Sequence, residues 1–65
     1  MYRNLKAEMA RADITGDDLA KELGITRSTM SRKINGMNEF TLKQAMQIKA
    51  ILKTDMALEY LFDRT

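Results

Sequence analysis

Five polar side chains recur between residues 27 and 35 at spacings that place them on one side of a helix. They include two arginines and no acidic residue: Arg27, Ser28, Ser31, Arg32 and Asn35. An arginine pairs bidentately with O6 and N7 of guanine, and a serine hydroxyl bonds to base edges or to phosphates. These residues therefore indicate a helix face suited to the major groove of double-stranded DNA.

The helix that carries this face has recognisable ends. Thr26 is a good N-cap, because its hydroxyl can accept an otherwise unpaired amide hydrogen of the first turn. Gly36 is a good stop signal, so we predict a helix from Arg27 to about Asn35. Met30 and Ile34 form its apolar side.

A second capped helix comes directly before it. Thr15 is the predicted N-cap of a helix from Gly16 to Leu23, with Asp18 in a near capping-box position. Gly24 ends this helix, since glycine enters the left-handed conformation without a Cβ clash. Two such helices joined by a few residues are the sequence form of a helix-turn-helix. The residues expected to pack between them are Leu19, Ala20, Leu23 and, in the turn, Ile25.

Two longer helices are expected on either side of this pair. Residues 2–12 carry one apolar stripe, and Arg3, Lys6 and Arg11 beside it serve either solubility or phosphate contact. Thr41 caps the other helix, which runs to about Lys53. Its expected inner half consists of Leu42, Ala45, Met46, Ile48, Lys49 and Leu52, with Ile51 at the margin. With no proline and no strand signal, the sequence predicts an all-α, five-helix domain.

The last of the five helices bears on self-association. Asp55 is expected to cap it, and it runs to about Phe62 with more apolar residues than the end of a monomer needs. Phe40, Met56, Tyr60 and Phe62 are the candidates for a dimer interface. The alternative is that two or more of these side chains complete the small core.

Composition limits the classes of function. The 65 residues suffice for one domain, taken as residues 1–65. The absence of cysteine and histidine excludes disulfides, zinc sites built from these residues, and catalytic triads that need imidazole. No apolar run has membrane-spanning length and no signal peptide is visible, so we expect a cytoplasmic protein without cofactor, metal or small-molecule ligand. Asp17, Asp18 and Glu22 fall where helix-start and solvent-facing charges belong, so we expect no enzyme.

The charge is unevenly distributed, although the formal net charge is only +2. Residues 26–36 hold three basic residues and no acidic one, whereas residues 54–65 hold three acidic residues and one basic one. A basic face on a near-neutral domain is typical of a DNA groove binder. The alternative is a solvated helix face whose charge has no partner.

Taken together, the chain resembles the Cro/repressor helix-turn-helix family, the DNA-binding domains of lambdoid phage repressors and Cro proteins. The resemblance covers about residues 5–61. The residues that carry it are Leu19-Ala20, Leu23-Gly24-Ile25-Thr26, Ser28, Met30-Ser31, Ile34-Asn35-Gly36, Leu42, Ile48 and Leu52. It implies a compact lambda repressor-like domain whose third helix enters the major groove. Such repressors bind as symmetric dimers on half-sites about one DNA turn, roughly 34 Å, apart.

The resemblance also assigns roles to individual residues. Arg27, Ser28 and Arg32 hold the positions that family members use for base edges. The positions implied to touch phosphates are Gly16, Thr26, Ser31, Lys33, Asn35 and Lys43. At Gly16 the phosphate would meet a backbone amide at the positive end of the helix dipole.

Three departures from the family pattern bear on this site. Many members have glutamine at the position of Gly16, where its side chain steadies a base-reading residue, so that contact is absent here. Many also have a buried ion pair where this chain has Met9 and Ile34, and an apolar pair of like volume is physically sensible there. Lys33 stands where an apolar residue is usual; it either extends along the core edge or reaches a phosphate.

The sequence thus favours a sequence-specific transcriptional regulator, a Cro-sized repressor from a phage or other mobile element that acts by occupying an operator. The length leaves no room for a C-terminal sensor domain, unless the chain is a fragment. The alternative is an antitoxin or other protein-interaction module whose apolar segment Met56–Phe62 covers a partner. That alternative predicts a heteromeric complex and weak DNA binding.

Overall fold

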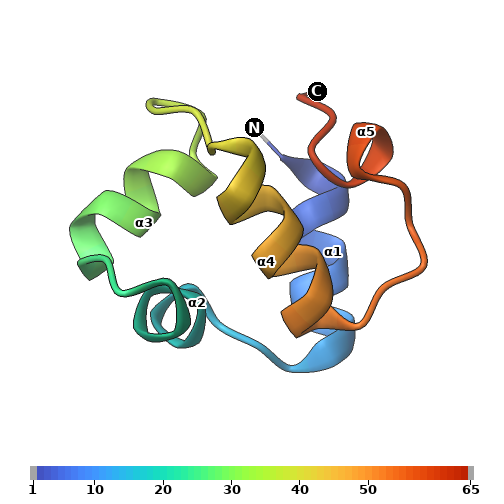
Figure 1. The fold of residues 1–65 in the computed structure, drawn as a ribbon, viewed down its shortest axis with the longest axis horizontal. Coiled ribbons are helices and arrows are strands. Elements are labelled where there is room, and N and C mark those ends of the chain that lie inside the picture. The colour runs from blue at the N-terminus through green and yellow to red at the C-terminus, as the bar shows by residue number, and fades with distance from the viewer. Residues whose placement is uncertain (1, 65) are drawn as a thin grey trace.

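The computed structural model describes residues 2–64, and this range holds five helices, in the number and order that the sequence predicts, and no strand (Figure 1). Their bounds are α1 (Arg3–Ala12), α2 (Gly16–Leu23), α3 (Arg27–Ile34), α4 (Leu42–Leu52) and α5 (Leu58–Leu61). The predicted ends of the first four helices agree with these bounds to within one residue. The all-α, five-helix prediction is therefore confirmed.

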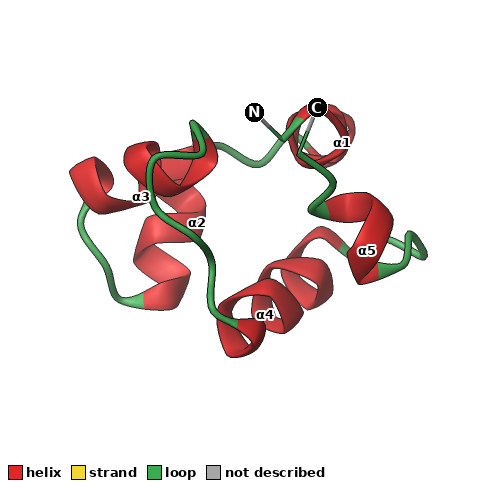
Figure 2. Cartoon of the chain, turned by 90° about the horizontal axis from the view of Figure 1, so that it is seen from above, coloured by secondary structure: helices red, strands yellow, loops and turns green. Residues whose placement is uncertain are grey.

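Helix α4 lies at the centre of the arrangement. It contacts α1, α2 and α5, whereas α3 packs chiefly on α2. Figure 1 shows α2 and α3 on the left, α4 crossing in front of α1, and α5 on the right. The view from above in Figure 2 keeps the α2–α3 pair on one side and α5 on the other. Helix α3 consequently lies at the edge of the molecule, with one side open.

Three threonines start the three helices that build this edge and the centre. The hydroxyls of Thr15, Thr26 and Thr41 accept the backbone amides of Asp18, Thr29 and Gln44, respectively. The side chains of Asp18 and Gln44 return the contact to the cap residue's own amide, which completes a capping box at each helix. Gly24 adopts the left-handed conformation, with a φ of 70°, where α2 ends. These local signals fix the helix-turn-helix, as predicted.

The start of the last helix differs from the prediction. Asp55 is not its cap: α5 begins at Leu58 after Ala57, and Ala57 makes no side-chain cap hydrogen bond. The hydroxyl of Thr54 accepts the amide of Met56 at 3.1 Å, which closes a turn one residue before the expected cap. The segment from residue 55 to residue 57 is therefore a linker, and α5 is a single turn.

Each helix contributes to one apolar core. The largest fully buried side chains are Leu5, Leu19, Met30, Ile48, Leu52 and Leu61. The prediction that Leu42 and Met46 belong to the inner side of α4 is wrong, because they are 70% and 56% exposed. The buried stripe of α4 is centred on Ile48 and Leu52, and at about 100° per residue Leu42 and Met46 are rotated away from it.

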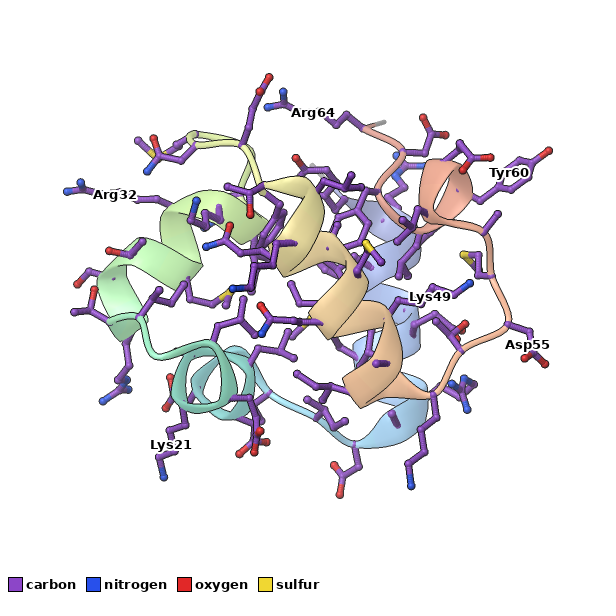
Figure 3. All side chains as sticks on the ribbon, viewed as in Figure 1. Lys21, Arg32, Lys49, Asp55, Tyr60 and Arg64 are labelled. Carbon is purple, nitrogen blue, oxygen red and sulfur yellow. The ribbon has the colours of Figure 1, made fainter. Side chains whose placement is uncertain are left out.

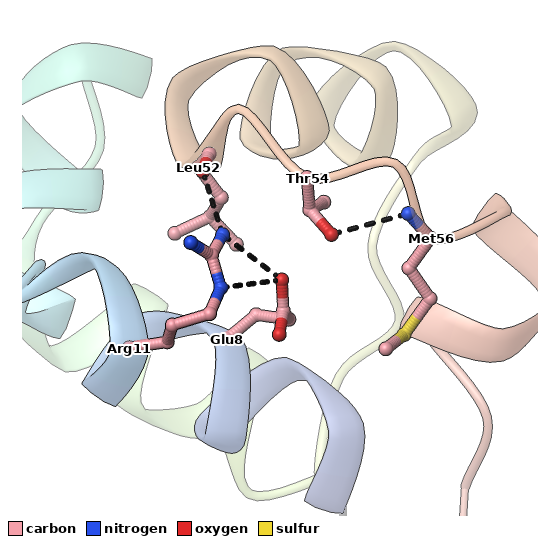
Figure 4. A network of polar contacts seen from close by, with 5 residues as sticks. All are labelled: Glu8, Arg11, Leu52, Thr54 and Met56. Carbon is pink, nitrogen blue, oxygen red and sulfur yellow. Dashed lines mark hydrogen bonds and ion pairs between the residues drawn. The ribbon is translucent and has the colours of Figure 1, made fainter.

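A polar network ties α1 to the end of α4 (Figure 4). The guanidinium of Arg11 pairs with Glu8 at 3.0 Å and donates to the carbonyl of Leu52 at 3.3 Å. It thus supplies a donor and a positive charge to the C-terminus of α4, where both are favourable. For Arg11, the two predicted alternatives were solubility and phosphate contact, and the structure shows this third use.

The pKa values of two carboxylates are lowered by these local contacts. Hydrogen bonding to the Thr54 hydroxyl, followed by the contact with Arg11, lowers the pKa of Glu8. The backbone amide and then the side chain of Thr15 lower the pKa of Asp18. A carboxylate whose pKa is lower in the folded state stabilises the fold above the unfolded pKa and loses that contribution as the pH falls through the folded value.

We predict that Glu8→Gln lowers the melting temperature at pH 7 and flattens its decline in acid. The parent should lose stability as the pH falls from about 5 towards 2, because protonation removes both carboxylate contacts. Thermal denaturation followed by circular dichroism over this range measures the difference, with Glu22→Gln at an exposed position as the control. An equally steep acid decline in Glu8→Gln and the parent would contradict the assignment.

Candidate nucleic-acid interface

Helix α3 divides into a buried side and an open side. Met30 is only 1% exposed and lies in the core, and Ile34 is half-buried beside it. The five polar residues that the sequence singled out, Arg27, Ser28, Ser31, Arg32 and Asn35, are all exposed. Figure 3 shows Arg32 pointing outward from α3 on the side away from α4. The predicted polar face therefore exists and is open to solvent.

The docking of α3 on α2 depends on Gly16. A Cβ atom at this position would lie 3.3 Å from Cδ1 of Ile34 and 3.9 Å from Cγ of Met30. A larger residue would press on Ile34, so the glycine and the isoleucine fit each other. This close approach gives a physical reason for two departures from the family pattern, at residue 16 and at residue 34. The half-buried Gly16 opens α2 directly beside the polar face.

Two hollows lie next to each other along this face. One, of about 330 Å³, is lined by Thr15, Gly16, Asp17, Arg27, Met30, Ser31, Ile34 and Asn35. The other, of about 680 Å³, is lined by Asp17, Arg27, Ser28, Ser31 and Arg32. All three predicted base-contacting residues line the second hollow. The structure thus brings the first turn of α2 and the open side of α3 into one continuous surface.

An ion pair that the sequence analysis missed joins these two elements. Nε of Arg27 donates to Oδ1 of Asp17 at 2.9 Å. From its position in the sequence, Asp17 was expected only at the helix start, where an acidic side chain is favourable. The sequence did contain a signal for this ion pair. A short turn between two helices brings the first turn of α2 near the first residue of α3, and the residues there, Asp17 and Arg27, have opposite charges.

Lys33 is directed towards the loop after α3. Its side chain is half-buried, Nζ donates to the carbonyl of Glu39 at 2.9 Å, and it lies 5.9 Å from the centre of the Phe40 ring. Of the two predicted alternatives, this geometry matches extension along the core edge. An ammonium group has three donors, so a phosphate contact would share it with the Glu39 carbonyl.

The other predicted phosphate contacts are distributed around α3. Thr26, before its first turn, is exposed, and its hydroxyl donates to Oγ1 of Thr29 at 2.9 Å. Nδ2 of Asn35, at the other end, lies 3.4 Å from Oγ of Ser31. Lys43 is exposed in the first turn of α4, across the loop that follows α3.

A second residue missed by the sequence analysis, Arg64, holds that loop from the C-terminal side. Its Nη2 donates to the carbonyl of Gly36, and its guanidinium lies 5.6 Å from the centre of the Tyr2 ring. Nη1 is also 3.9 Å from the Glu39 carboxylate. Gly36 has a φ of 83°, and a Cβ there would lie 3.0 Å from Nη2 of Arg64. No sequence pattern relates residue 64 to residue 36, because the contact is tertiary.

The four residues predicted for a dimer interface occupy different environments. Phe40 and Phe62 form a cluster with the buried Tyr2, with ring centres 5.2 to 5.8 Å apart. Met56 is half-buried and also packs on the core. Tyr60 is 67% exposed. Three of the four thus help to complete the core, which was the alternative interpretation.

Within residues 2–64, no group of three or more acidic side chains is placed to hold a metal ion. None of the helices described there combines the length and the apolar content that crossing a bilayer requires.

Comparison with known proteins supplies one match. The family model for the Cro/C1-type helix-turn-helix DNA-binding domain matches residues 4–57. No curated protein and no solved structure shows a significant match to the chain. The matched range includes α1 from its second residue onward and all of α2 to α4, and it excludes the four-residue α5 and Arg64.

We predict that Arg64→Ala loosens the loop that follows α3. The amides of Met37 and Asn38, which donate to the carbonyl of Arg32, should exchange with solvent about threefold to tenfold faster when the hydrogen bond to Gly36 is lost. Hydrogen exchange followed by NMR measures the rates. Lys53→Asn, which removes one positive charge after α4, is the control, and unchanged rates in Arg64→Ala would rule out this restraint.

Proposed function

Since this chain belongs to the Cro/C1-type helix-turn-helix DNA-binding domains, we propose that it is a sequence-specific transcriptional regulator that reads the major groove with α3. The proposal rests on the difference between the two sides of α3. Met30 anchors one side in the core, and every polar residue of the other side is exposed. Binding to double-stranded DNA follows from the family, and the identity of the contacting residues is the proposal.

In the proposed complex, Arg27, Ser28 and Arg32 contact base edges. Arginine supplies the paired donors that guanine accepts, and serine adapts to either donors or acceptors. The phosphate contacts come from residues around them: Gly16, Thr26, Ser31, Lys33, Asn35 and Lys43. Such contacts fix the register of the protein on the duplex, whereas the base contacts carry the specificity.

We further propose that the protein acts as a repressor of a phage or another mobile element, in the cytoplasm, by covering an operator that overlaps a promoter. Helix-turn-helix repressors bind as dimers with two-fold symmetry, and the proposal includes a homodimer on DNA. The large apolar side chains exposed among residues 2–64 are Met37, Leu42, Met46 and Tyr60, and of the four predicted interface residues only Tyr60 is among them. We therefore place Tyr60, but not the buried parts of Phe40 and Phe62, at the dimer contact.

No observation adds weight to the protein-interaction alternative. It required the apolar segment from residue 56 to residue 62 to be displayed to a partner. In the structure, Met56 and Phe62 pack against the core, and Leu61 is fully buried. The fold of the chain thus accounts for these apolar side chains, and Tyr60 is the large apolar side chain of the segment that stays exposed.

The proposal is tested by selecting duplexes from a random DNA pool at about 150 mM salt, where weak unspecific binding is screened. We expect an inverted repeat with half-site centres about one helical turn apart. A single unrepeated site would retain the regulator and exclude the symmetric dimer. No enrichment by the folded protein would exclude sequence-specific regulation.

We predict that Arg32→Ala weakens binding to the selected duplex by about 1–3 kcal/mol and relaxes the preference at one base position. Fluorescence anisotropy with single-base variants of that duplex measures both effects. Lys21→Ala is the matched control, because Lys21 points away from Arg32 and its loss removes the same charge (Figure 3). Equal losses in Arg32→Ala and Lys21→Ala, with the base preference intact, would remove Arg32 from the base contacts.

A further inference from the structure

The ion pair between Asp17 and Arg27 places a carboxylate on a surface proposed to face phosphates. The side chains of Asp17 and Arg27 are 53% and 82% exposed, so water screens their attraction. Exposed pairs of this kind contribute little to stability. Both residues line both hollows of the candidate interface. The pair is therefore better explained by what it does to Arg27 at this surface than by a contribution to folding.

The geometry of the pair selects which donors of Arg27 face outward. The carboxylate of Asp17 engages Nε. Because this hydrogen bond uses Nε, it leaves the donors of the two terminal NH₂ groups of Arg27 for another partner. These two groups form the fork that reaches O6 and N7 of guanine together. Asp17 thus holds the guanidinium in an orientation that suits an end-on contact with a base pair.

The negative charge of Asp17 also weakens binding to DNA that lacks the preferred sequence. A carboxylate beside the proposed phosphate contacts at Gly16 and Ser31 repels DNA of any sequence. It also competes with phosphates for Arg27, which in an unspecific complex would otherwise be free to neutralise one. Specificity is a difference between affinities, and an element that weakens the wrong complex raises it as effectively as one that strengthens the right complex.

We propose that Asp17 is a specificity-determining residue: through its 2.9 Å contact with Nε, it aims the terminal NH₂ groups of Arg27 at a base and holds them away from phosphates. This inference rests on the proposed function, since it takes the open side of α3 to be the DNA-reading surface. In many family members a glutamine at the position of Gly16 steadies a base-reading residue. Gly16 has no side chain to do this, and the inference gives that role to Asp17.

The test compares Asp17→Asn with the parent on two probes, the duplex recovered by selection and a mixed-sequence duplex of equal length. Asn keeps the size of the side chain and removes its charge. Binding to the mixed-sequence duplex should become about fivefold tighter, because one negative charge fewer faces the phosphates. The ratio of the two affinities should fall about tenfold, because Arg27 is no longer held for the base.

Two further variants separate orientation from plain charge. Glu22→Gln removes one negative charge from the same helix without touching Arg27, and it should leave the affinity ratio unchanged. In an Arg27→Ala background, Asp17→Asn should tighten binding to both duplexes alike and no longer alter the ratio. A fall in the ratio that is equal in Glu22→Gln, or that persists without Arg27, overturns the proposal.

A measurement without DNA tests the contact itself. The Nε–H resonance of Arg27 in NMR spectra should exchange with solvent more slowly in the parent than in Asp17→Asn, and equal exchange would overturn the proposal. The outcomes also distinguish this inference from the function on which it rests. A parent protein that binds the two duplexes equally contradicts the proposed function, whereas a selective parent with an unaffected Asp17→Asn variant contradicts only the role of Asp17.

Discussion

The burial of Met30, together with the close approach of Ile34 to Gly16, is the constraint on which the rest of the structure depends. Helix α3 has eight residues and a single fully buried side chain, so it has little apolar surface with which to fix its own position. Met30 enters the core, and the missing side chain at Gly16 lets α2 come close enough to hold Ile34. Every exposed side chain of α3 takes its direction from these contacts.

A helix held this way can be polar wherever it does not touch the core. Only one side of α3 is buried, so its polar side chains do not have to lose their water when the protein folds. The arginines and serines on the other side remain solvated until a binding partner replaces that water. The loop after α3 is restrained from two directions, by Lys33 on the carbonyl of Glu39 and by Arg64 on that of Gly36. The loop that joins α3 to α4 is therefore held both from α3 itself, through Lys33, and from the C-terminal segment, through Arg64.

The sequence predicted the features that depend on neighbours in the chain. Thr15, Thr26 and Thr41 cap their helices because a hydroxyl and an amide three residues on need nothing else to meet. The prediction of Asp55 as a cap was wrong because α5 begins three residues later, at Leu58, after a turn closed by the Thr54 hydroxyl and the amide of Met56. The exposure of Leu42 and Met46 and the contacts of Arg64 depend on how helices are turned and packed, which no local pattern encodes.

The central claim, that the open side of α3 is the DNA-reading surface, is tested most directly by NMR titration of the ¹⁵N-labelled protein with the duplex it selects. The account predicts that the amides whose resonances shift belong to α3, the first turn of α2 and the loop after α3. Shifts confined to the surface around Leu42, Met46 and Tyr60 would contradict it, because DNA would then be bound by a different face of the same fold.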